Sequence, residues 1–381
     1  MTPADISDYR ELARRRLPFF LFEYIDGGSY AETTLARNMG DFQSIILRQN
    51  VMRDVSKLNL AIELFGQKWA MPVALSPIGL GGMYARRGEV QTARAAEKNG
   101  VPFTLSTMSC CAIEEVRPKV DTPPWLQLYM IKDRAFMADL LGRATAAGIT
   151  NLVLTVDLPV HSVRHRDVRS GLTGPQGLDV RIARFVDVLC HPFWAFDVGV
   201  MGRPHILGNV APAMPNGAGL DQFTAWVGRN FDPSITWKDL DWIRGHWKGR
   251  LIIKGVLEAD DARAAVSAGA EGVIVSNHGG RQLDGAPSTI SALPQIADAL
   301  AGAAPILLDG GVRSGVDVLR ALALGASAVM LGRPWAFALA AAGERGVANM
   351  LTLLRHEIEV AMALSGQTDV KTIDRSLIAP H

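Results

Sequence analysis

The sequence is poor in cysteine and carries almost no net charge. Its 381 residues include only three cysteines, too few for the disulfide framework of a secreted protein. Lysine and arginine total 39 against 38 for aspartate and glutamate, so the net charge is +1. A nucleic-acid-binding protein usually has a basic surplus, and its absence here argues against that class.

Long hydrophobic runs are also absent. No stretch of about 18 uncharged apolar residues occurs, so we expect no membrane-spanning helix. The apolar stretch from Leu17 to Tyr24 is short and contains Pro18 and Glu23, which argues against a signal peptide. We therefore expect the protein to lie on the cytoplasmic side of the inner membrane. Peripheral contact with that membrane is compatible with these observations.

What the sequence does contain is eight short apolar runs, most of them followed by helix-like segments. The runs are too short for helices and too uniformly apolar for half-exposed strands, so they predict parallel strands buried on both faces. Eight such units predict a (βα)8 TIM barrel; a doubly wound open sheet is the alternative, weakened by the lack of GxGxxG after the first strand. The runs are Met71–Ser76, Val101–Ser106, Trp125–Tyr129, Leu152–Val156, Leu251–Lys254, Val273–Ser276, Ile306–Leu308 and Ala328–Leu331.

The helix-like segments between the runs are alanine-rich and amphipathic, and several end in a glycine just before the next strand. Glycine tolerates the left-handed conformation that ends many helices. The clearest segments are Val90–Asn99, Ala135–Ala147, Ala259–Ala268 and Val316–Ala323, and the glycines are Gly100, Gly148, Gly269 and Gly325.

Two parts of the chain lie outside this repeat. Residues 1–70 form an N-terminal extension that we expect to be helical, and residues 158–236 form an insertion after strand four. Without them the barrel, at 71–157 and 237–365, has the length of a bare barrel, so we expect one domain over 1–381. The insertion is rich in glycine, proline and aromatic residues. It either packs on its own protein or faces a membrane or partner through exposed aromatic side chains.

Glycines and arginines follow strands seven and eight. In barrels, phosphate sites often lie after these strands. Gly310 and Gly311 would let backbone amides approach an anion, and Arg313 and Arg333 would donate charge-assisted hydrogen bonds. This pattern predicts a phosphate site, although a simple strand-to-helix turn is the alternative.

Lys254 ends a run of buried apolar residues. A lysine in such a place needs an anionic partner or a lowered pKa. It would therefore form a Schiff base with a substrate or stabilise negative charge on a cofactor; a lysine reaching the rim is the third interpretation.

His278 lies among glycines three residues before Arg281. A histidine in this position is suited to act as a base beside an anion-binding arginine. Asp157, at the end of strand four, would orient the imidazole. Arg164 would join Arg281 in binding a carboxylate, unless it is a surface arginine.

These residues together resemble the FMN-dependent α-hydroxy acid dehydrogenase/oxidase family over essentially the whole chain. The segment SNHGGRQLD at Ser276–Asp284 matches the family signature. Within the family, the segments MPVALSPIGLGGMYARRGEV and NFDPSITWKDLDWIR most resemble bacterial respiratory, quinone-linked L-lactate dehydrogenases. Further matches are EYIDGG at Glu23–Gly28, LQLY at Leu126–Tyr129, LTVDLP at Leu154–Pro159, IKG at Ile253–Gly255 and LDGGVRSG at Leu308–Gly315.

The resemblance implies a role for each matching residue. His278, Asp157 and Lys254 would form the catalytic group, with Lys254 facing the flavin. The substrate-binding residues would be Tyr24, Tyr129, Arg164 and Arg281. The cofactor would be FMN, bound by Ser76, Pro77, Ser106, Gln127, Thr155, Lys254, Ser276, Asp309, Gly311, Arg313, Gly332 and Arg333, and no metal site is expected.

The resemblance also implies the reaction and the partners. The expected reaction is oxidation of a 2-hydroxy acid, foremost L-lactate to pyruvate, with electrons passed through FMN to a quinone or another respiratory acceptor. Gly79, where many oxidases carry alanine, favours a dehydrogenase. A homotetramer is expected, and any membrane contact would use residues 158–236. The alternatives are a mandelate or glycolate enzyme of the same family, a Schiff-base lyase using Lys254, and a barrel that only binds phosphorylated ligands.

Overall fold

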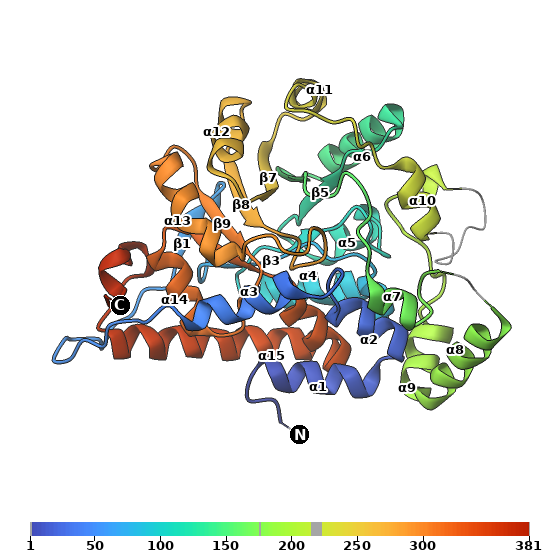
Figure 1. The fold of residues 1–381 in the computed structure, drawn as a ribbon, viewed down its shortest axis with the longest axis horizontal. Helices are drawn as coiled ribbons and strands as arrows, with labels where there is room; N and C mark the ends of the chain where they lie inside the picture. The colour runs from blue at the N-terminus through green and yellow to red at the C-terminus, as the bar shows by residue number, and fades with distance from the viewer. Residues whose placement is uncertain (1, 175–176, 215–222, 381) are drawn as a thin grey trace.

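Eight parallel strands form the centre of the molecule (Figure 1). The computed structural model describes residues 2–174, 177–214 and 223–380. The strands pair in the order β3-β10-β9-β8-β7-β6-β5-β4, and a parallel bridge between Leu75 and Phe103 joins the ends of the sheet. This confirms the predicted (βα)8 barrel. The strands are β3 (Val73–Leu75), β4 (Thr104–Leu105), β5 (Trp125–Tyr129), β6 (Asn151–Thr155), β7 (Arg250–Val256), β8 (Gly272–Ser276), β9 (Ile306–Asp309) and β10 (Ala328–Leu331).

A helix follows each barrel strand, and the four predicted helical segments are confirmed. The four predicted glycines after them have positive φ angles, because each ends a helix in a left-handed conformation. The barrel helices are α4 (Gly88–Lys98), α5 (Ile113–Val116), α6 (Arg134–Ala146), α11 (Asp239–His246), α12 (Ala259–Ser267), α13 (Thr289–Leu300), α14 (Gly315–Ala323) and α15 (Arg333–Ser365). Short helical turns are η1 (Gly81–Met83), η2 (Arg117–Lys119), η6 (Val370–Thr372) and η7 (Arg375–Leu377).

The N-terminal extension is helical, as predicted, but it also contains a β-hairpin that the sequence did not indicate. Phe65, in the hairpin turn, lies edge-on to Trp125 at 5.4 Å between ring centroids. Because Trp125 begins β5, the hairpin covers the N-terminal end of the barrel. The other end is left free for a site. The elements are α1 (Ile6–Arg16), α2 (Phe19–Asp26), α3 (Thr33–Gln43), β1 (Ile62–Leu64) and β2 (Gln67–Trp69).

The insertion folds largely into helices, and α8 and α9 lie at the edge of the molecule beside α2 (Figure 1). Trp194 contacts Phe20 edge-on at 6.3 Å, and Asp187 accepts a hydrogen bond from the Phe19 amide, so one face packs on its own protein. Residues 175–176 and 215–222 of the predicted insertion lie outside the described residues. Its helices are α7 (His165–Arg169), α8 (Leu178–Cys190), α9 (Pro192–Trp194), η3 (Ala195–Val200), η4 (Ala211–Ala213) and α10 (Phe223–Asn230).

Candidate active site

A cavity opens at the C-terminal ends of the barrel strands. About 1080 Å³ of its space is free of protein atoms and is partly continuous with solvent. This is the end at which barrel enzymes build their sites. The residues predicted for the site that line the cavity are Tyr24, Ser76, Pro77, Ser106, Tyr129, Arg164, Lys254, His278, Arg281, Asp309, Gly311, Arg313, Gly332 and Arg333.

Four other predicted residues lie one layer behind the cavity wall and contact the lining residues. Gln127 accepts a hydrogen bond from the Ser106 hydroxyl at 3.2 Å and donates one to Thr155 at 3.1 Å. These contacts fix the rotamers of three polar side chains on neighbouring strands. The remaining two residues, Asp157 and Ser276, hold His278 and Lys254 respectively.

The imidazole of His278 is held by Asp157. Its Nδ1 lies 2.9 Å from Asp157 Oδ1, so Nδ1–H donates to the carboxylate and Nε2 keeps its lone pair. Burial lowers the pKa of His278, and the opposing effect of Asp157 is smaller. The residue itself has a φ of 58° and precedes two glycines that also have positive φ. This left-handed turn brings the ring to the cavity, and the neutral imidazole there is suited to act as a base.

Lys254 belongs to a buried ionic network. Its Nζ lies 2.8 Å from Asp309 Oδ2 and donates to Ser276 Oγ at 2.9 Å, while Ser76 donates to the other Asp309 oxygen at 2.6 Å. Burial opposes the charge on the lysine, but Asp309 and Asp157 outweigh it and raise the pKa of Lys254. A charged, paired ammonium is a poor nucleophile, which argues against the Schiff-base alternative. Its side chain is 4% exposed, so it is no rim lysine.

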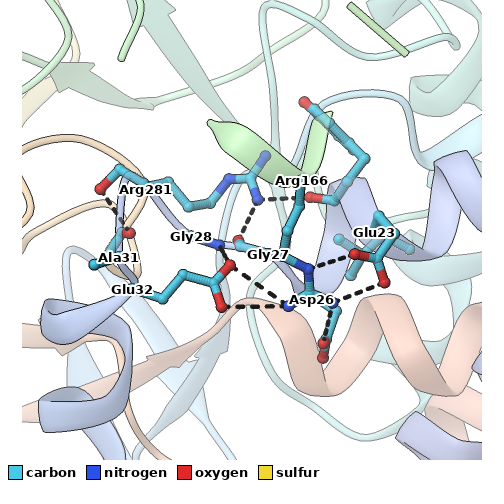
Figure 2. Close-up of polar contacts among 12 residues, drawn as sticks. Glu23, Asp26, Gly27, Gly28, Ala31, Glu32, Arg166 and Arg281 are labelled. Carbon is cyan, nitrogen blue, oxygen red and sulfur yellow. Dashed lines mark hydrogen bonds and ion pairs between the residues drawn. The ribbon is translucent and has the colours of Figure 1, made fainter. Parts of the chain in front are cut away.

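Two arginines stand at the mouth, and the buried carboxylate of Asp167 is close enough to interact with both. Arg164 is 6% exposed, contrary to the surface alternative, and burial lowers its pKa to about 10. Its nearest carboxylate oxygen, on Asp167, is 3.9 Å away. Arg281 donates to the Gly27 carbonyl (Figure 2). It also donates to the Tyr24 carbonyl, and its guanidinium lies 4.7 Å from the centre of the Tyr24 ring. This arrangement is suited to bind a small carboxylate.

Arg313 and Arg333 form a second cationic group after strands seven and eight. Burial lowers the pKa of Arg313 to about 10 and that of Arg333 well below its ordinary value. In the described part of the chain, neither guanidinium has a carboxylate within 4 Å, and Arg333 donates to the carbonyls of Ile25, Gly27 and Gly279. Two desolvated cations beside glycine backbone fit a phosphate.

Sequence reasoning missed part of the cavity wall. Met108 lies two residues beyond Ser106, so position after a strand could have found it. Phe231 gave no such signal. It lies at the far end of the insertion and reaches the site by an antiparallel bridge to Ile131, with its ring 4.8 Å from that of Tyr129. The missed lining residues include Ile25, Tyr84, Met108, Leu158, His161, Phe231, Gly279 and Met330.

The fold and site define a barrel enzyme whose mouth combines an imidazole, one pair of arginines beside it and a second pair of arginines beside glycine backbone. The family model described as FMN-dependent dehydrogenase matches residues 13–380. The chain belongs to this FMN-dependent dehydrogenase family.

Known proteins with similar sequences match this chain over almost its whole length. It is 58% identical over 369 residues to an L-lactate dehydrogenase of Stenotrophomonas maltophilia (strain R551-3), covering 97% of both chains. It is 57% identical over 379 residues to an L-lactate dehydrogenase of Caulobacter sp. (strain K31), covering 100% of this chain and 99% of the other.

The solved structures that resemble it share its architecture. A monotopic membrane protein, (S)-mandelate dehydrogenase, superposes with a TM-score of 0.93 at 36% identity, with both chains covered completely. A mandelate oxidase superposes with a TM-score of 0.82 at 37% identity, over 97% of this chain and 96% of the other.

The residues present fit FMN. The phosphate would meet Arg313 and Arg333, which have no carboxylate partner in the described residues. Gly311, which lines the cavity beside them, must be glycine, because its φ is 87° and an added Cβ would clash with the Asn38 carbonyl oxygen. The ammonium of Lys254 stands on the cavity wall, where it would stabilise negative charge on a reduced flavin.

Proposed function

We propose that this protein oxidises L-lactate to pyruvate with FMN as its cofactor. The observation that carries the proposal is the placement of the His278 imidazole in one cavity with Arg164, Arg281 and Lys254. The two L-lactate dehydrogenases that share 57–58% identity support lactate as the substrate. We also propose that the whole chain forms one domain, which the match over residues 13–380 supports.

The proposed roles follow from the positions of the side chains. Arg164 and Arg281 bind the substrate carboxylate, and Tyr24 and Tyr129 contact the carboxylate or hydroxyl, which fixes the orientation of C2. Nε2 of His278 accepts a proton from the substrate, and Asp157 stabilises the resulting imidazolium. Lactate loses two electrons and two protons: one proton goes to His278, and bound FMN supplies the acceptor for both electrons and the other proton.

The cofactor would be held by the remaining predicted residues. Arg313, Arg333, Gly311 and Gly332 would bind its phosphate, and Asp309 its ribityl chain. The ring system would lie against Lys254, Ser76, Pro77 and Ser106, which line the cavity, and Gln127, Thr155 and Ser276 would support these residues from the layer behind.

Steady-state assays with L-lactate, mandelate and glycolate and an artificial dye test the substrate. The purified protein should show a flavin spectrum that bleaches when L-lactate is added without oxygen. Mandelate is the second candidate because the solved structures with the same fold act on it by name. If lactate is the poorest of the three substrates, the proposal is wrong.

The pH dependence of kcat/KM tests His278 as the base. Burial lowers its pKa below the ordinary value of 6.5, and only the neutral imidazole accepts a proton. Activity should therefore be full at neutral pH and fall as the pH drops through a value below 6.5. Because Asp157 raises the pKa of His278, Asp157→Asn should move this fall to still lower pH. An unchanged midpoint would contradict the assignment.

For the electron acceptor we propose a membrane quinone, reached through the outer face of the insertion. The side chains of Phe185 and Phe193 are 64% and 82% exposed. Such a concentration of exposed apolar side chains is typical of an interaction surface. A structural relative is called a monotopic membrane protein, and within the described residues no helix could cross a bilayer. The exposed apolar side chains are Leu178, Ile182, Phe185, Val186, Leu189, Phe193, Phe196, Val200 and Met201.

Vesicle flotation tests this membrane surface. The Phe185→Gln/Phe193→Gln variant should lose most of its binding to phospholipid vesicles, because two large apolar contacts are removed while glutamine keeps the helix. Its activity with a soluble dye should be unchanged. Leu364→Gln, an exposed leucine on α15, is the matched control and should bind like wild type. Equal binding by all three proteins would rule out this surface.

A further inference from the structure

Arg166 is the centre of an ion-pair cluster that joins the insertion to the N-terminal segment (Figure 2). Its guanidinium binds Glu23 through two hydrogen bonds, at 2.5 and 2.9 Å, and Asp26 through a third at 2.8 Å. Glu32 lies at 3.5 Å. A planar guanidinium can meet several carboxylates at once, which an ammonium cannot do with the same geometry.

The acidic residues of this cluster belong to the segment that supports the site. The backbone carbonyls of Tyr24 and Gly27 accept hydrogen bonds from Arg281, and those of Ile25 and Gly27 accept from Arg333. The C-terminal end of α2 and the two glycines after it, residues 23–28, therefore hold an arginine of the proposed carboxylate site and another of the proposed phosphate site.

Arg166 itself also lies next to the site in the chain. Arg166 lies in α7, whose preceding residue is Arg164. Thus Arg166 fixes two chain segments, distant in sequence, that each bring a substrate-binding residue: Tyr24 on one side and Arg164 on the other. No sequence motif indicated this, because the partners are more than 130 residues apart.

Carboxylates outnumber guanidinium groups in this cluster. Asp26 also pairs with Arg10 at 2.5 Å, so three carboxylates face two guanidinium groups. Asp26 and Glu32 in turn favour the charged form of Arg333. Removal of Arg166 would leave the three carboxylates facing each other with Arg10 as their cation, and residues 23–28 would move away from the mouth.

We propose that Arg166 is a positioning residue for substrate binding. It holds Tyr24, Arg164 and Arg281 at the spacing that a 2-hydroxy acid carboxylate requires, without contacting the substrate. The inference rests on the proposed function of these three residues.

Steady-state kinetics of the FMN-loaded Arg166→Met variant test the inference. Because the contacts of His278 with Asp157 and of Lys254 with Asp309 do not involve residues 23–28, KM for L-lactate should rise about 10- to 100-fold while kcat of the FMN-loaded variant falls much less. Arg166→Lys should recover part of the loss, since it keeps the charge but not the paired hydrogen bonds. A titration of the FMN-loaded variant with pyruvate, followed by the change in the flavin spectrum, measures binding without turnover. Arg166→Met should bind pyruvate more weakly than the wild-type protein does.

The control is Arg169→Met, an exposed arginine on the same helix, which should leave KM unchanged. If Arg166→Met does not fold, Glu23→Gln is the second variant. It weakens the two hydrogen bonds between Arg166 and residue 23 but keeps Arg166 itself, and KM for L-lactate should again rise. A lower melting temperature with unchanged KM and unchanged pyruvate binding would reduce Arg166 to a structural role and overturn the inference. Failure of the wild-type protein to oxidise any 2-hydroxy acid would instead refute the proposed function.

Discussion

The His278→Asn variant is expected to lose turnover of L-lactate by about 10²- to 10⁴-fold while it keeps its FMN. An amide cannot accept the proton that the imidazole Nε2 takes in the proposed reaction. Asparagine is chosen because residue 278 has a φ of 58°, which asparagine tolerates better than alanine does. The measurement is kcat with a soluble dye, together with the flavin absorbance per protein.

A result of this kind has one decisive control. The variant should still bind pyruvate, because Arg164 and Arg281 are unchanged, and this can be read from the flavin spectrum. Turnover within a few-fold of wild type would exclude His278 as the base. Loss of both FMN and pyruvate binding would show that the loop at residues 277–280 had collapsed, and the assignment would then depend on the pH dependence of the wild-type enzyme.

Replacing Lys254 by methionine should have the second large effect, on stability and on flavin reduction together. Methionine has a similar length but leaves Asp309, 7% exposed, as a buried carboxylate without its cation. Removal of one partner of a buried ion pair costs about 3–5 kcal/mol. We expect a lower free energy of unfolding in urea and a much slower bleaching of the flavin by L-lactate.

The double variant Lys254→Met/Asp309→Asn separates the two effects. Asparagine can keep hydrogen bonds to Ser76 and Ser276 without the uncompensated charge, so stability should recover in large part. Flavin reduction should stay slow, because the ammonium proposed to stabilise the reduced cofactor is absent from the double variant. Full recovery of the rate would contradict the role proposed for Lys254.

Much of the fold could be predicted from the sequence because barrel strands are buried on both faces. Runs such as Leu152–Val156 are apolar except for Thr155, and a glycine such as Gly148 ends the helix before each of several strands. The β1–β2 hairpin was missed since its strands have three residues each, too few for a periodic pattern. Its position depends on contact with Trp125, which no local signal indicates.

Much of the candidate site could also be predicted, because its residues follow the same apolar strands. Parallel strands end at one edge of a barrel, so polar residues such as Lys254 and His278 that follow apolar runs must meet there. The pairing of His278 with Asp157 spans 121 positions in the chain and could be proposed only because both follow strands. Phe231 and Arg166 do not follow strands, and neither was found.

By itself, the sequence determined which strands form the barrel and which strand ends carry the proposed base, the lysine and the glycines of the proposed phosphate site. Only the tertiary structure decided how the two added segments complete the mouth. Periodicity and motifs report local burial and backbone conformation. The contacts of Arg166 with Glu23 and Asp26, and of the insertion with α2, arise when distant segments pack together, and they are set by shape and charge at surfaces that do not exist until the barrel has formed.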